Sequence, residues 1–92
     1  MNLPSPRSSV VVQGVSEGAI LFCTETETYF SLNPVGVQVW RLLPPACSTE
    51  AEIVLRLRRD HPEIPAETIE SDVRELLAEL VKHRLVEVLQ AA

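Results

Sequence analysis

The side chains best suited to catalysis are few in this chain and lie far apart in the sequence. There are two cysteines, Cys23 and Cys47, and two histidines, His61 and His83. A Cys–His nucleophile pair needs its members within hydrogen-bond reach, and a structural zinc site needs four ligands. Cys23 lies in an apolar, strand-like run and Cys47 in a loop, while both histidines lie where we expect helices to end. We therefore predict no catalytic residue, no metal site and no cofactor.

Neither the acidic residues nor the glycines form a catalytic pattern. Acidic pairs such as Glu25 and Glu27 occur where the sequence predicts exposed turns or helix starts, and there they favour solvation or complement a helix dipole. The three glycines are isolated from one another, so there is no glycine-rich loop to hold a phosphate. The sequence thus predicts that the protein is not an enzyme.

Length and charge limit the remaining classes. A chain of 92 residues with 46% apolar residues can build one domain around one small core. Thirteen acidic residues outnumber eight basic ones, giving a net charge of −5, whereas nucleic-acid binding rests on Lys and Arg at phosphates. There is no apolar run of about 18 residues and no secretory signal. Two cysteines are too sparse for a disulfide framework, so we expect reduced thiols and a cytoplasmic protein. The acidic balance and the lack of a long apolar run lead us to expect neither nucleic acid nor membrane as partner.

The first half of the chain predicts a small sheet. Three β-prone runs, 9–13, 19–24 and 28–32, follow each other closely, which indicates an antiparallel meander. The run 19–24 is continuously apolar and predicts burial on both faces. Residues 1–9 contain two prolines and three serines, so we predict a flexible N-terminal tail followed by one domain over residues 10–89.

The second half predicts three helices. Asn33 can cap a helix that has Pro34 at its first position, and this helix continues to about Leu43. Thr49 and Glu52 form a capping box for a second helix. A third spans about 66–83, with Ile69, Val73, Leu76 and Leu80 on its core face, and a β-prone segment, 85–89, follows. The predicted fold class is α+β, winged helix-turn-helix-like, with a three-stranded antiparallel sheet followed by three helices.

The run 28–32 can leave one sheet edge unpaired. It contains neither lysine nor proline, the residues that usually protect such an edge. An extended peptide could add there as a further strand. Alternatively, another part of this chain or a second copy covers the edge, and the pattern alone does not decide between these possibilities.

A helical wheel of the third helix shows two different flanks beside the core face. Leu77 and Val81 lie on one flank with Glu70, Arg74 and Ala78, whereas the other flank is wholly polar and includes Asp72, Glu79 and His83. We predict a peptide groove on the first flank, unless Leu77 and Val81 only widen the core. The predicted peptide-binding residues are Thr28, Tyr29, Phe30, Ser31, Glu70, Arg74, Leu77, Ala78 and Val81.

Three motifs carry a resemblance to a known family: Ala19-Ile20-Leu21-Phe22, the run Tyr29-Phe30-Ser31-Leu32-Asn33-Pro34-Val35-Gly36, and Val39-Trp40. In order and spacing they resemble the PqqD-like recognition elements of ribosomally synthesised, modified peptides, nearest in spelling to the stand-alone proteins of lasso peptide biosynthesis. Relatives often carry a glycine near Glu27 and another before Leu85, and an acidic residue near Cys23, all absent here.

The resemblance implies a function for the open edge. Members bind a leader peptide between the third strand and the third helix without catalysing a reaction. It implies a leader with a Tyr-x-x-Pro motif, whose tyrosine and proline occupy apolar pockets. The partner that receives the leader would be a separate leader peptidase, followed by a cyclase.

The alternative function is a winged-helix DNA-binding transcriptional regulator. The second and third helices are arranged as in a helix-turn-helix pair, and Arg56, Arg58 and Arg59 could contact phosphates. The acidic balance of the chain and the many carboxylates of the third helix oppose it.

Overall fold

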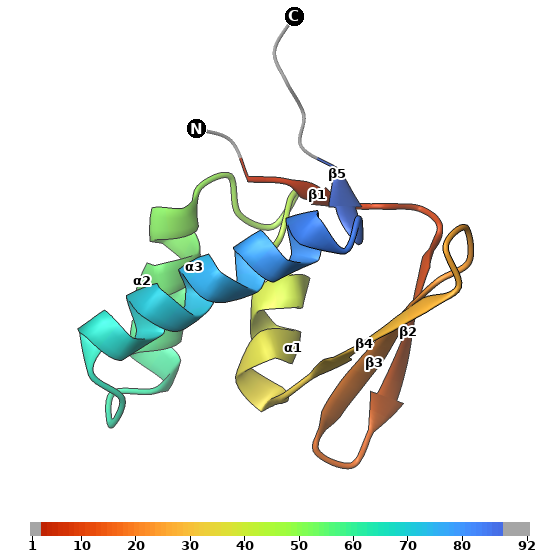
Figure 1. Cartoon of the computed structure of the whole chain (residues 1–92). Helices are drawn as coiled ribbons and strands as arrows, with labels where there is room; N and C mark the ends of the chain where they lie inside the picture. The colour runs from red at the N-terminus through yellow and green to blue at the C-terminus, as the bar shows by residue number, and fades with distance from the viewer. Residues whose placement is uncertain (1–2, 88–92) are drawn as a thin grey trace, which may run out of the picture.

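Two small sheets and three helices make up the fold (Figure 1). The computed structural model describes residues 3–87. Its elements are β1 (Ser5–Pro6), β2 (Val10–Val15), β3 (Gly18–Cys23), β4 (Thr28–Leu32), α1 (Pro34–Arg41), α2 (Glu50–Asp60), α3 (Ala66–Lys82) and β5 (Val86–Glu87). The predicted fold class is confirmed: a three-stranded antiparallel sheet precedes three helices, and β1 and β5 add a two-stranded sheet.

The three-stranded sheet has the order β2-β3-β4, with both pairs antiparallel. In the central strand, Ala19, Leu21 and Cys23 are buried, whereas Ile20 and Phe22 are only half-buried. The prediction of burial on both faces is therefore wrong for β3. The helices supply the apolar partners of one face, and the other face stays partly open to solvent.

A capped corner joins the sheet to α1. The Asn33 side chain accepts a hydrogen bond from the Gly36 N–H at 2.7 Å, and Pro34 takes the first helical position, as predicted. The helix ends at Arg41, two residues before the predicted end, and continues as turns. Val39 is buried, and α1 contacts β3, β4 and α3. This helix therefore lies between the sheet and α3.

The other two helices complete the core. The Thr49 hydroxyl accepts from the Glu52 N–H at 3.2 Å, and the Glu52 carboxylate accepts from the Ser48 N–H at 3.2 Å, so the predicted capping interaction forms. The two helices pack together, and Ile53, Leu57, Ile69, Val73 and Leu80 are buried in the shared core. None of the helices described is long and apolar enough to cross a membrane.

The two ends of the described chain pack together. Ser5 pairs with Glu87 and Pro6 with Val86, and Leu3 is buried in the core. Residues 3–7 thus have defined packing, which the prediction of a tail did not anticipate, because one buried leucine and a two-residue strand leave little signal. Residues 1–2 of the predicted tail, and 88–89 of the predicted last strand, lie outside the described residues.

Within residues 3–87, two non-glycine residues have positive φ angles, and both lie near positions where the family resemblance implies glycine. Glu27 has φ 55° in the β3–β4 turn, and Arg84 has φ 58° just after α3. The Leu85 N–H donates to the Leu80 carbonyl at 2.9 Å, so the helix still closes in the way that usually uses glycine. A side chain in this conformation costs about 1–2 kcal/mol, which is free energy that the fold absorbs.

We expect Arg84→Gly and Glu27→Gly each to raise the free energy of unfolding by about 0.5–1 kcal/mol. The removed strain of about 1–2 kcal/mol outweighs the extra backbone entropy of glycine in the unfolded chain. Arg74→Gly, inside α3, is the matched control and should lower stability by about 1 kcal/mol. Urea unfolding followed by the single tryptophan measures all three, and a loss of stability in Arg84→Gly would contradict the strain.

Candidate functional site

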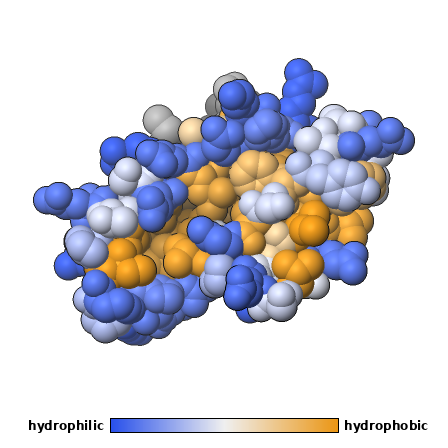
Figure 2. All heavy atoms as spheres, turned by 60° about the horizontal axis from the view of Figure 1, so that its bottom comes forward, coloured by the Kyte–Doolittle hydropathy of each residue, from blue (hydrophilic) through white to orange (hydrophobic). Residues whose placement is uncertain are grey.

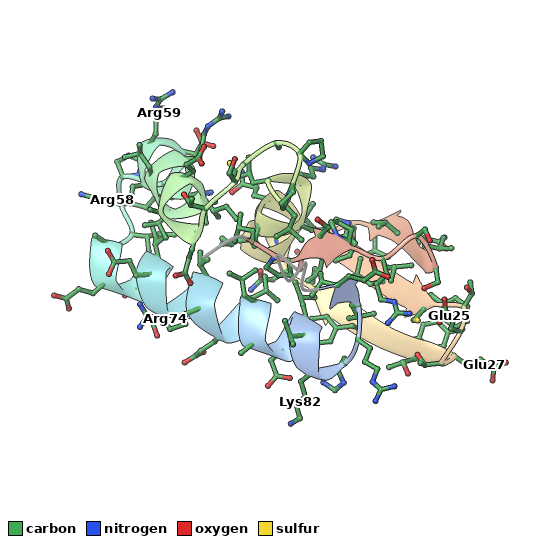
Figure 3. The ribbon with its side chains drawn as sticks, turned by 90° about the horizontal axis from the view of Figure 1, so that it is seen from above. Glu25, Glu27, Arg58, Arg59, Arg74 and Lys82 are labelled. Atoms are coloured by element: carbon green, nitrogen blue, oxygen red, sulfur yellow. The ribbon has the colours of Figure 1, made fainter. Side chains whose placement is uncertain are left out.

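The outer edge of β4 is open. β4 is the last strand in the sheet order, and within residues 3–87 no other strand pairs with its far side. Figures 1 and 3 both show β4 running alongside α3 in the opposite chain direction. The backbone N–H and C=O groups along this edge are therefore available to a partner that lies between β4 and α3.

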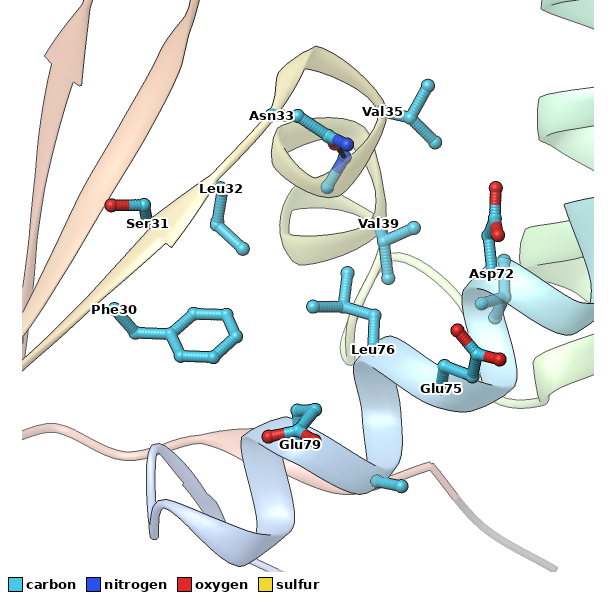
Figure 4. A pocket seen from close by; sticks show the side chains of 13 residues that line it. Phe30, Ser31, Leu32, Asn33, Val35, Val39, Asp72, Glu75, Leu76 and Glu79 are labelled. Atoms are coloured by element: carbon cyan, nitrogen blue, oxygen red, sulfur yellow. Dashed lines mark hydrogen bonds between the residues drawn. The ribbon is translucent and has the colours of Figure 1, made fainter.

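A groove of about 520 Å³ lies between β4 and α3, with α1 as its floor (Figure 4). Figure 2 views the molecule from the side where α1 begins, and apolar surface runs across the middle of this face between hydrophilic borders. The groove is lined by Phe30, Ser31 and Leu32 of β4, by Asn33, Val35, Gly36 and Val39 around α1, and by Asp72, Val73, Glu75, Leu76, Ala78 and Glu79 of α3. It therefore combines an apolar floor with an unpaired strand edge.

The start of α1 shapes the floor. Gly36 is buried, and a Cβ added there would lie 3.2 Å from the Asn33 Oδ1 atom and 3.3 Å from the Leu32 side chain. Glycine thus lets the first turn of α1 lie tightly against the end of β4. Val35 and Val39, one turn apart, then face the groove.

A chain of contacts fixes one end of the groove. The rings of Phe30 and His83 have centroids 5.6 Å apart, and the His83 Nε2 atom lies 3.2 Å from a Glu79 carboxylate oxygen. These contacts connect the strand wall to the helix wall. They hold Phe30 at the rim, where its ring can contact a bound side chain.

Some of the predicted site residues line the groove. Phe30, Ser31 and Ala78 do so. Thr28 and Tyr29 belong to β4 but lie outside the lining, and Tyr29 is 70% exposed beside Phe22. The structure thus leaves the edge of β4 unpaired, one of the possibilities that the pattern of the run 28–32 left open, and of the two aromatic residues predicted to bind peptide only Phe30 lines the groove.

The groove does not lie on the flank of α3 that was predicted from the sequence. Glu70 and Arg74 line a separate hollow against α2, Leu77 packs against the core, and Val81 is exposed outside the groove. The groove instead opens on the polar flank that carries Asp72 and Glu79. A helical wheel separates the two flanks but does not show which one faces the sheet, because the packing of α3 on α1 decides that.

The floor of the groove was not predicted from the sequence. Val35 and Val39 were named only within the motifs of the family resemblance, and Asn33 as a helix cap and within the same motifs. Their spacing of four residues was a signal for one shared helix face, but nothing local indicated that this face meets a groove. Val35 and Val39 on this floor thus supply apolar surface that Leu77 and Val81 of α3 were predicted to supply.

Charge is unevenly distributed around the site. Asp72, Glu75 and Glu79 lie on the α3 side of the groove (Figure 4). Arg58 and Arg59 lie on α2 and do not line the groove (Figure 3). In the part of the chain that the structure describes, no three His, Cys, Asp or Glu side chains are grouped to hold a metal. The groove can thus bind through backbone pairing, apolar contact and charge.

The cysteines lie away from this groove. Both are free thiols and both are buried. Hydrogen bonds to the side chain and backbone of Thr26 lower the pKa of the Cys23 thiol to about 7. Neither cysteine lines the groove, so we assign them to the core.

Comparisons with known proteins agree with this geometry. The structure "TbiB1 in Complex with the TbiA(beta) Leader Peptide" is 28% identical, with a TM-score of 0.79 over 95% of this chain and 99% of that one. A lasso peptide synthetase B1 complexed with the leader peptide is 18% identical, with a TM-score of 0.71 over 91% of this chain and 95% of that one, a likeness that shows the fold. Among curated proteins no sequence matches.

A family model described as coenzyme PQQ synthesis protein D (PqqD) matches residues 18–86. This match begins at the first residue of β3 and ends at the first residue of β5, so it includes every element that lines the groove. The resemblance stated from the motifs is confirmed: this chain belongs to the PqqD family.

Proposed function

We propose that this protein binds the leader region of a ribosomally synthesised precursor peptide, that of a lasso peptide, without itself catalysing a reaction. The observation that carries the proposal is the apolar groove beside the unpaired edge of β4. Two proteins of the same fold are described in complex with leader peptides, which supports this occupant.

The proposed binding mode is strand addition. A leader in extended conformation pairs its backbone with β4, and every second side chain then points at the floor formed by α1. The groove volume of about 520 Å³ is typical of sites that enclose a few side chains. Residues i and i+3 of a regular strand point to opposite faces. The tyrosine and proline of a Tyr-x-x-Pro motif, which the family resemblance implies, would therefore both reach this apolar space near Val35 and Leu76 only if the leader departs from regular strand geometry within the motif.

The bound leader would be delivered to a separate leader peptidase, with a cyclase acting afterwards. Binding converts the encounter between precursor and enzyme into one within a single complex, which raises the effective concentration of the cleavage site. In this scheme the protein contributes affinity and position, and the partner enzymes contribute the catalytic groups.

The alternative of DNA binding has less support. Carboxylates line the groove side of α3, and they repel phosphates. Arg58 and Arg59 lie on the outer side of α2, on a chain with a net charge of −5. Retention on heparin at moderate salt, together with binding to duplex DNA, would favour this alternative over peptide recognition.

A fluorescein-labelled leader peptide with a Tyr-x-x-Pro motif, taken from a short reading frame beside the gene, should bind selectively. We expect a dissociation constant of about 1 μM or tighter, which corresponds to about −8 kcal/mol. Fluorescence anisotropy measures the binding, with a scrambled peptide as control. If the folded protein binds both peptides equally weakly, the proposal fails.

Leu76→Glu and Val35→Glu should each weaken leader binding at least about ten-fold, because each places a carboxylate in the apolar part of the groove. Val35 lies in the first turn of α1, where an acidic residue complements the helix dipole, so this variant should keep the fold. Val81→Glu is the matched control on the other flank of α3 and should bind like wild type. Circular dichroism verifies folding, and loss of binding in the control alone would contradict the groove.

A further inference from the structure

We propose that the groove also selects its peptide by charge, and that it binds leaders with basic side chains at two alternate positions, facing the acidic wall of α3. This inference rests on the proposed function and adds the class of peptide that the site accepts. The acidic wall is defined here as Asp72, Glu75 and Glu79. All three line the groove, and Figure 4 shows them on α3, the helix that borders the groove across from β4.

The acidic wall is not neutralised by the protein itself. Within residues 3–87, Asp72 and Glu75 form no ion pair, and Glu79 pairs with His83 alone. The wall residues are exposed, so their charges cost little in the free protein and are available to a partner. A peptide with cations at the right positions would remove the mutual repulsion of these carboxylates.

The spacing of the acidic wall matches an extended peptide. Glu75 and Glu79 are four residues apart on α3, which is about 6 Å along the helix axis. Residues i and i+2 of a β-strand lie on the same face, about 6.6 Å apart. Because β4 and α3 run alongside each other in both Figure 1 and Figure 3, a strand added to β4 also runs along α3. Two basic residues at i and i+2 can therefore meet Glu75 and Glu79 together.

Apolar contact and charge can act on the same peptide. Side chains that point at Val35 and Val39 supply the apolar contact, and alternate side chains point the other way. Lysine and arginine have long apolar stems, so they can lie along the rim of the groove while their charged ends reach the carboxylates. The pattern that we infer is thus apolar residues alternating with basic ones.

Three series of labelled peptides test this inference. All share one Tyr-x-x-Pro motif and carry Lys-x-Lys, Gln-x-Gln or Glu-x-Glu, and this pair is moved along the peptide one residue at a time. In the best register we expect Lys-x-Lys to bind about five-fold tighter than Gln-x-Gln, as for two partly exposed ion pairs, and Glu-x-Glu to bind more weakly than both. The preference should fall below about two-fold in 0.5 M NaCl.

Protein variants assign the preference to the acidic wall. Glu75→Gln with Glu79→Gln should remove it, whereas Glu67→Gln with Glu70→Gln, the same charge change on other faces of α3, should keep it. A preference that survives in the first double variant overturns the assignment. Equal binding of all three series in every register overturns the inference but leaves the proposed function standing. If no peptide binds, both fail.

Discussion

The groove depends on the capped corner at which β4 becomes α1. The side chain of Asn33 holds the first turn of the helix through the Gly36 N–H, and Gly36 lacks the Cβ that would press on Asn33 and Leu32. Pro34 occupies the first helical position, where its fixed φ angle favours the helix. As a result α1 lies against both the sheet and α3, and the groove remains between β4 and α3.

In the binding mode that we propose, the open edge and the groove have different roles. Backbone pairing along β4 would supply affinity that does not depend on sequence, whereas the floor and the acidic wall would select side chains. An unpaired edge is normally a hazard because other chains can pair with it. Here the edge lies beside the groove, with α3 on the other side. Phe30, which contacts His83, lies on the β4 side of the groove, and the carboxylate of Glu79 lies on the α3 side.

The helices and strands were predicted well because each of the signals that mark them lies within a few neighbouring residues. The cap at Asn33, the box at Thr49 and the run 28–32 all gave elements close to those observed. The groove flank of α3 was not predictable in this way, since it depends on how α3 packs against α1. The burial of Leu3 was missed for a related reason: its partners, the core residues and the Ser48 carbonyl that accepts from the Leu3 N–H, are distant in sequence. The sequence therefore predicted the strand that borders the groove, but not the face of α3 that lines it.

Hydrogen exchange of the β4 amides, with and without the Tyr-x-x-Pro leader, tests the central claim most directly. Strand addition gives a new hydrogen bond to every second N–H of an edge strand. The account predicts that alternate amides within Thr28–Leu32 become strongly protected when the leader binds, while the amides of α2 do not change. Binding that protects α2, or that leaves the β4 amides exchanging as before, would contradict it.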